Sequence, residues 1–164
     1  MPFYFLDTKV IIIECLAVKN TGRVSVFLIN GSWIQKLLSM FSLFYKNRVE
    51  GTGGVLLLKR DIMCYEFTVF FCSFIFLEVM FAHNEASRAG VINVYSPNNI
   101  FSFIKCIFSK NRALNGGGVL ATFYTNTIQG FNNFYSKNTA ERAGVYDYTG
   151  SLVNEINSSF LYNS

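Results

Sequence analysis

Charged side chains are scarce in this sequence of 164 residues: Asp, Glu, Lys and Arg make up 15%, while apolar residues make up 51%. A chain with so few charges and so many apolar side chains buries a core, which excludes a disordered protein. The net charge of +4 is small as well, and nucleic-acid-binding proteins usually carry a denser basic patch, so we expect no nucleic-acid partner. The length fits one domain over residues 1–164.

Several functional motifs are missing. The sequence contains no phosphate-binding loop, dinucleotide fingerprint, zinc-protease helix or nucleophile elbow. The one histidine, His83, has no partner at metal-ligand spacing, so we expect neither a metal nor another cofactor. The N-terminal stretch MPFYFLDTKV has no basic n-region and does not read as a secretory signal.

Only one apolar segment, Ile62 to Ala82, has the length of a membrane span. Glu66 and Glu78 interrupt it, and the uninterrupted part, Phe67 to Leu77, is shorter than the roughly 20 residues that a bilayer requires. The segment is also rich in Phe, Val and Ile, which suits buried strands. A protein anchored in the membrane through this segment is therefore an alternative, not the leading interpretation.

The sequence does contain an internal repeat of about 25 to 27 residues. The stretch FYKNRVEGTGGVL at residues 44–56 is nearly respelled as FSKNRALNGGGVL at residues 108–120. An asparagine recurs at intervals of 27, 37, 27, 27 and 25 residues, at Asn20, Asn47, Asn84, Asn111, Asn138 and Asn163. An aromatic residue stands three positions earlier at Phe44, Phe81, Phe108, Tyr135 and Phe160, and a glycine six positions later at Gly53, Gly90, Gly117 and Gly144.

Within each repeat the apolar residues alternate, as in Ile104, Cys106 and Phe108, which is typical of strands. Strands and turns at this period predict an all-β fold, a parallel β-helix of about five to six coils in which equivalent residues form ladders. We expect the aromatic rings to stack in the core and the asparagines to bond to backbone and to one another at a turn. We expect the glycines to supply positive φ at the corner.

One interval is ten residues longer than its neighbours, and the surplus lies around residues 59–76. We interpret it as an enlarged coil with a hydrophobic underside; the alternatives are a groove-shaping loop, a membrane-touching segment or a misread intron. Cys64 and Cys72 lie in this coil and could pair. Cys15 and Cys106 share a repeat position several coils apart, beyond the roughly 7 Å limit for a disulfide, so we expect small core residues.

Two charged rows are expected near the asparagines. A basic edge directly precedes them, at Lys19, Lys46, His83, Lys110 and Lys137. It is either a binding stripe for an anionic polymer such as an acidic glycan or a solvated edge. Glutamates recur after the asparagines together with arginines, at Glu50, Glu85, Glu141, Arg48, Arg88, Arg112 and Arg142. We expect mutual neutralisation in this second row, with a carboxylate site as the alternative.

The repeat motifs resemble those of a known family. An F-x-x-N motif stands as FYKN, FAHN, FSKN and FLYN, with YSKN as a near match, and a glycine motif stands as GGVL twice, AGVI and AGVY. They resemble the repeats of the polymorphic outer membrane proteins of chlamydiae and of large surface proteins of protists, in the pectin-lyase-like group. The resemblance covers roughly residues 10–164. It implies a right-handed parallel β-helix, a noncatalytic surface segment and often an adhesin.

We therefore expect a surface or secreted β-helix segment that recognises a glycan or a surface protein, located at the cell surface or outside the cell. Membrane association is expected through a parent protein, and no catalytic residue is expected. The alternatives are a carbohydrate-active β-helix enzyme, a lyase or hydrolase or a degenerate relative, and the membrane-anchored protein described above. Neither end of the sequence contains a recognisable cap, so we expect a fragment that continues into flanking coils of a longer chain.

Overall fold

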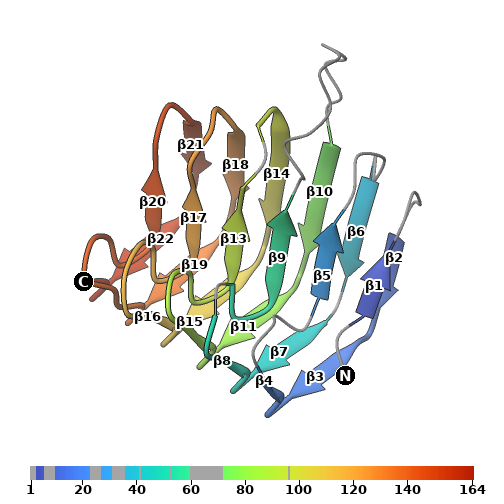
Figure 1. Ribbon diagram of the computed structural model, residues 1–164. Coiled ribbons are helices and arrows are strands. Elements are labelled where there is room, and N and C mark those ends of the chain that lie inside the picture. The colour runs from blue at the N-terminus through green and yellow to red at the C-terminus, as the bar shows by residue number, and fades with distance from the viewer. Residues whose placement is uncertain are drawn as a thin grey trace.

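The chain forms a parallel β-solenoid in a computed structural model, as the repeat predicts (Figure 1). The structure describes residues 3–5, 10–22, 27–30, 36–40, 42–51, 53–59, 72–95 and 97–164. Within these ranges the chain is all-β, without a helix, and neighbouring strands in each sheet run parallel. Each coil contributes one strand to each of several sheets, so residues about one repeat apart lie side by side.

Three of the four sheets of the solenoid contain six strands each. Sheet A contains β1 (Phe3–Phe5), β5 (Phe27–Asn30), β9 (Leu56–Lys59), β13 (Ile92–Val94), β17 (Leu120–Thr122) and β20 (Tyr146–Tyr148). Sheet B contains β2 (Val10–Ile13), β6 (Lys36–Met40), β10 (Cys72–Leu77), β14 (Asn99–Ile104), β18 (Thr127–Phe131) and β21 (Leu152–Ile156).

Two further sheets complete the coils. Sheet C has six strands, β3 (Leu16–Val18), β7 (Leu43–Tyr45), β11 (Met80–Ala82), β15 (Ile107–Ser109), β19 (Phe134–Ser136) and β22 (Ser159–Leu161). Sheet D has four short strands, β4 (Thr21–Gly22), β8 (Arg48–Val49), β12 (Glu85–Ala86) and β16 (Arg112–Ala113). The asparagines of the repeat lie at the turn between sheets C and D.

The aromatic ladder predicted from the repeat is confirmed on sheet C. Neighbouring rings along Phe44, Phe81, Phe108, Tyr135 and Phe160 are stacked, with centroids 5.2, 5.0, 4.9 and 4.6 Å apart. Sheet B adds two stacked pairs, Phe74 on Phe101 and Phe76 on Phe103. All of these rings except Phe160, which is exposed, pack in one continuous core, and burying each core ring stabilises the fold by about 1.5–3 kcal/mol.

The asparagine ladder is confirmed bond by bond. The side-chain oxygen of each asparagine accepts two hydrogen bonds from the preceding one, from its backbone N–H and from its side-chain amide, as between Asn84 and Asn111. The second amide hydrogen goes to the carbonyl three residues before the preceding asparagine, as from Asn111 Nδ2 to Phe81 O at 2.9 Å. The same pattern runs from Asn20 to Asn163. The asparagines therefore satisfy buried backbone groups where the chain turns.

The glycines require a correction. Of the four expected to have positive φ, only Gly53 does, with φ of 69°. The glycines that face one another are Gly54, Gly90, Gly118 and Gly144, and a Cβ on each of the first three would lie 2.1–2.3 Å from the carbonyl oxygen of the next. Gly53 and Gly117 belong to the neighbouring row, which continues at Ala143. Close approach of successive backbones, rather than a left-handed conformation, therefore selects glycine here.

A polar cluster interrupts the apolar core at its C-terminal coil. The position held by Phe76 and Phe103 on sheet B is Gly130 in the next strand and Glu155 in the one after. The Glu155 carboxylate accepts hydrogen bonds from the hydroxyls of Tyr135 at 2.7 Å and Tyr146 at 2.5 Å. Burial, followed by the nearby charge of Glu155, raises the pKa of Tyr135 well above its usual value, so this phenol stays a donor.

Gly130 and Glu155 should be energetically coupled. A Cβ on Gly130 would lie 1.8 Å from the Glu155 carboxylate, so Gly130→Ala has to push that group away from both tyrosines. We expect Gly130→Ala to lower the free energy of unfolding by about 2–3 kcal/mol, because a partly buried, charged hydrogen-bond network is broken. In urea unfolding, Gly130→Ala/Glu155→Ala should be no less stable than Glu155→Ala alone. Strict additivity of the two single changes would contradict this coupling.

The enlarged coil and the apolar segment are only partly described. Residues 60–71, which include Cys64, lie outside the described residues, as does the Cys72 side chain, so the proposed Cys64–Cys72 pair cannot be placed. Residues 72–82 form strands β10 and β11, with Phe74, Phe76 and Phe81 in the core, not part of a spanning helix. Among the described residues no helix is long and apolar enough to cross a bilayer.

Candidate functional site

The basic edge lies at one turn that recurs in every coil. Its five residues connect sheet C to the following asparagine, and all have left-handed backbone, with φ of 55°, 54°, 56°, 54° and 53° from Lys19 to Lys137. Each of their backbone N–H groups donates to the next coil, as from Lys46 to Ala82 O at 3.0 Å and from His83 to Ser109 O at 2.9 Å. The turn therefore holds these side chains in one row, spaced by the interstrand distance of about 4.8 Å.

A left-handed turn is an unusual place for lysine. Most residues that carry a Cβ are disfavoured in the left-handed conformation by about 1–2 kcal/mol. Glycine and, less often, asparagine are the residues usually found there. Lysine nevertheless occupies the turn four times, with His83 in the fifth position and Tyr162 continuing the row. The four lysines are exposed and His83 is half-buried. The left-handed turn does not require a lysine, so these exposed side chains are accessible to a ligand.

The charges of the basic edge act on one another. Partial burial lowers the pKa of His83 below its usual value, and the positive charges of Lys110 and Lys46 lower it further. Tyr45 lies alongside, with its ring centroid 5.3 Å from that of His83 and 5.0 Å from Lys46 Nζ. His83 is thus close enough to two lysines to be a pH-dependent member of the same positive row.

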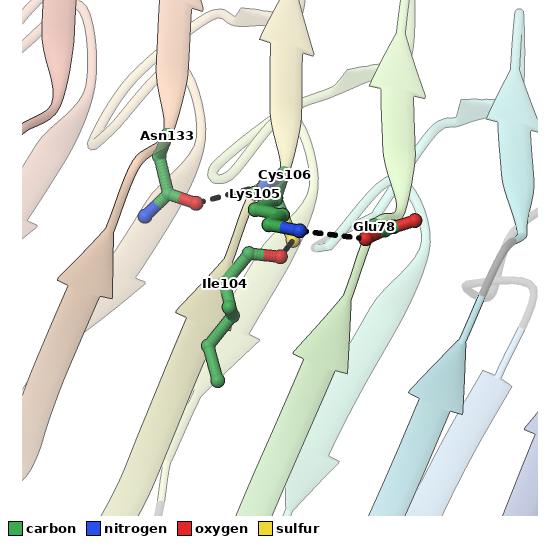
Figure 2. Close-up of polar contacts among 5 residues, drawn as sticks. All are labelled: Glu78, Ile104, Lys105, Cys106 and Asn133. Atoms are coloured by element: carbon green, nitrogen blue, oxygen red, sulfur yellow. Dashed lines mark hydrogen bonds and ion pairs between the residues drawn. The ribbon is translucent and has the colours of Figure 1, made fainter.

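The turn between sheets B and C provides a comparison (Figure 2). It is also left-handed, at Glu14, Glu78, Lys105, Asn132 and Asn157. Lys105 Nζ lies 3.2 Å from Glu78 Oε1, so its charge is paired, as the dashed line in Figure 2 marks. The two left-handed turns therefore differ in chemistry, because one carries a paired charge and the other a row of one sign.

The arginine and glutamate row is neutralised around Glu85, as expected. Glu85 Oε1 lies 3.9 Å from Arg48 Nε and 3.8 Å from Arg112 Nη1, and the three residues are in register on sheet D. Arg142 pairs with Asp147 at 3.5 Å rather than with a glutamate. Glu141 is exposed and lies outside the Glu85 row. Among the described residues no group of three or more His, Cys, Asp or Glu side chains could hold a metal ion.

Cys15 and Cys106, the two cysteines whose side chains are described, are free, as their spacing predicts, but Cys15 is only half-buried and is not part of the core, contrary to the expectation. Cys106 is fully buried behind the Lys105 turn, where its backbone N–H donates to Asn133 Oδ1 at 2.9 Å (Figure 2). Its thiol lies 3.3 Å from the Phe76 carbonyl oxygen and 3.5 Å from that of Ile104, so one of them accepts its hydrogen. Burial raises the pKa of Cys106 to about 11, so the thiol stays protonated and is a core residue.

A polar and aromatic cluster on the outer face of sheet A was not predicted. The Arg88 guanidinium lies 3.9 Å from the centroid of the Phe123 ring, which stacks on Tyr95. Beside it, Asn93 is fully buried, and both polar atoms of its side chain lack a partner. Gly116 makes room, because a Cβ there would lie 2.4 Å from the Arg88 carbonyl oxygen and 3.3 Å from Arg88 Cγ. Strand alternation predicts that Asn93 and Tyr95 lie on the same face of sheet A. No periodic pattern in the sequence predicts that the Arg88 side chain extends to the Phe123 ring.

The structure thus brings the five residues of the basic edge together as predicted. The resemblance to the chlamydial repeat also stays a prediction. No protein-family model, curated protein or solved structure matches the chain.

Proposed function

We propose that the chain is a noncatalytic recognition solenoid that binds an acidic polysaccharide along the basic edge, as part of a surface or secreted protein. The observation that supports this function is the row of Lys19, Lys46, His83, Lys110 and Lys137 at one left-handed turn. A straight row of like charges at a fixed spacing suits an extended polyanion, whose own charges recur along its length. The repeat motifs, which resemble those of surface β-helix proteins, support the location.

The geometry favours a polymer over a small ligand. No described carboxylate pairs with the lysines of the row, in contrast to Lys105 at the other turn. Like charges held in a row repel one another, and a polyanion relieves that repulsion at several positions at once. Each exposed contact is weak, about 0.2–1 kcal/mol, so useful affinity requires several coils to contact one chain.

Lys110→Gln should weaken binding of dextran sulfate about threefold, whereas Lys105→Gln should leave it unchanged. The two variants remove the same charge at two equivalent left-handed turns, but only Lys110 belongs to the basic edge. The factor corresponds to an exposed ion pair of about 0.6 kcal/mol. Titration by fluorescence anisotropy at low salt measures it, with uncharged dextran as the polymer control. Equal losses in the two variants would mean that only net charge matters, and would overturn the proposed site.

Binding should strengthen as the pH falls from 8 to 5. A polyanion favours protonated His83, which lies beside Lys46, Lys110 and Tyr45, and the charge is gained as the pH falls through the lowered pKa of this histidine. Without the polymer, the free energy of unfolding should fall slightly as the pH falls, because His83 binds a proton more readily in the unfolded chain than in the folded one. His83→Lys should bind tightly at both pH values, and His83→Gln should lose the pH dependence. The sulfate groups of the polymer stay ionised throughout.

A further inference from the structure

The outer face of sheet A contains a buried amide without a partner. Asn93 lies in the middle of β13, between Ile92 and Val94, whose side chains pack in the core. Because side chains alternate along a strand, the Asn93 side chain points to the outer face of the sheet. It is nevertheless fully buried, and among the described residues neither its amide oxygen nor its amide nitrogen has a hydrogen-bond partner. A buried amide in this state lowers the stability of the free protein, so it requires an explanation.

The C-terminal coil shows which group is missing beside Asn93. Arg142 precedes Asp147 by five residues, and its Nη1 lies 3.5 Å from Asp147 Oδ2. Arg88 precedes Asn93 by the same five residues. Asn93 and Asp147 belong to one outward row of sheet A, with Ala121 of β17 between them (Figure 1). The coil of Arg88 therefore has an amide in place of the carboxylate that pairs with Arg142.

The Arg88 side chain is accordingly a cation without an anion. In the described part of the chain it forms no ion pair, and its Nε is buried without a hydrogen-bond partner. Its guanidinium lies instead over the Phe123 ring, 3.9 Å from the centroid, and that ring stacks on Tyr95. Arg88, Phe123 and Tyr95 are each only partly buried, so solvent reaches this side of the cluster.

Arg88 also borders the row in which Asn93 lies. A Cβ on Gly116 would be 3.3 Å from Arg88 Cγ and 3.4 Å from Ala121 Cβ, so both side chains border the same space next to Gly116. Ala121 is the partner of Asn93 in register, about 4.8 Å away along the sheet. A movement of the Arg88 side chain off the Phe123 ring, which no hydrogen bond or ion pair with a described residue opposes, therefore uncovers this row.

We propose that Arg88, Asn93 and the Phe123 ring bind a small α-hydroxy acid with an apolar side chain. The guanidinium and the amide nitrogen donate to the carboxylate, the amide oxygen accepts from the hydroxyl, and the ring packs against the apolar part. A hydroxyl suits the amide oxygen better than the ammonium of an amino acid, because the neighbouring Arg88 is already positive. This site is separate from the basic edge and does not depend on the function proposed above.

Calorimetric titration with phenyllactate tests the site, because the ring, carboxylate and hydroxyl of this acid match the three contacts. We expect a dissociation constant of about 0.1–1 mM, which is reasonable for a ligand of this size. Phenylpropionate, which lacks the hydroxyl, and the neutral amide of phenyllactate should each bind at least about tenfold more weakly, because buried polar groups then stay unpaired. No binding of phenyllactate at about 10 mM overturns the proposal.

Arg88→Gln should abolish phenyllactate binding, whereas Arg142→Gln should leave it unchanged. Both substitutions remove one arginine at equivalent corners, but Arg142 is already paired with Asp147. Equal losses would mean that only net charge matters, and would overturn the site. Lys110→Gln separates this site from the basic edge and should bind like the unmodified chain. Loss of binding in Lys110→Gln but not in Arg88→Gln would overturn the α-hydroxy acid site and leave the proposed polysaccharide function intact.

Asn93→Val distinguishes a ligand site from a structural amide. Valine is close to asparagine in size, favours strands and has no polar group. It should therefore raise the midpoint of thermal unfolding of the free protein by about 2–4 °C and abolish phenyllactate binding. A more stable protein that no longer binds shows that the amide serves the ligand. A lower midpoint with binding retained would mean that a buried water satisfies Asn93 in the free fold, and would overturn its role.

Discussion

Replacing Asn111 by alanine should lower the free energy of unfolding by about 3–5 kcal/mol, a large part of the stability of a typical domain. Asn111 is fully buried at the middle of the asparagine ladder. Its side-chain oxygen accepts from the backbone N–H of Asn84 at 3.1 Å and from the Asn84 amide at 3.0 Å, and its own amide donates to Asn138 and Phe81. The substitution leaves two donors of Asn84 and the Phe81 carbonyl buried without partners.

Urea unfolding followed by circular dichroism measures this loss, and Asn154→Ala is the matched control. Asn154 lies on strand β21 with an exposed side chain outside the ladder, so its replacement should change the free energy of unfolding by less than about 0.5 kcal/mol. Asn111→Asp tests the chemistry further, because a carboxylate keeps the acceptor but loses the amide donors. An Asn111→Ala protein as stable as Asn154→Ala would show that the ladder contributes no net stability.

The ladders could be predicted from the sequence because a parallel solenoid places each repeat position directly beside its copy. Aromatic side chains that recur in register, such as Phe81 and Phe108, lie close enough to stack. Asparagine side chains that recur in register, such as Asn84 and Asn111, lie close enough to form hydrogen bonds. The basic edge was predicted for the same reason. Its left-handed backbone was not, because lysine carries no local signal for positive φ.

Features that depend on one coil could not be predicted in this way. Counting six residues from each asparagine predicted that Gly53 lies beside Gly90. The corners after Asn47 and Asn111, however, each contain one more residue than the corners after Asn84 and Asn138. The row of facing glycines therefore begins at Gly54. Glu155 enters the core only because Gly130 leaves space in the preceding coil. Such compensation occurs once and has no period, so repeat analysis does not detect it.

The fold also explains how a row of like charges arises from residues far apart in sequence. Lys46 and Lys110 are separated by 64 positions, yet both lie beside His83 and lower its pKa. The turn fixes the backbone at each coil, so the lysines can change without disturbing the asparagine next to them. Surface charge and stability are thus assigned to adjacent residues of one turn: the lysines are exposed, whereas the asparagines from Asn47 to Asn138 are buried.

Gly118→Ala should be the most damaging small substitution, with a loss of about 3 kcal/mol or more, or failure to fold. A Cβ at this position would lie 2.3 Å from the Gly144 carbonyl oxygen and 3.0 Å from the Thr139 backbone nitrogen. Both are backbone atoms held by the neighbouring coil, so no side chain can rotate away. Gly150→Ala is the decisive comparison, because Gly150 has positive φ but meets only Thr125 Oγ1, at 3.4 Å.

If close approach selects the glycines of this corner, Gly118→Ala should be several times more destabilising than Gly150→Ala, for which strain at positive φ predicts about 1–2 kcal/mol. If backbone conformation selects them, the order should reverse, because Gly118 does not have positive φ. Urea unfolding of both variants under one set of conditions decides between the two explanations. The larger loss at Gly118 would mean that coil spacing at this corner is set by contact between successive backbones, which leaves room for no side chain at all.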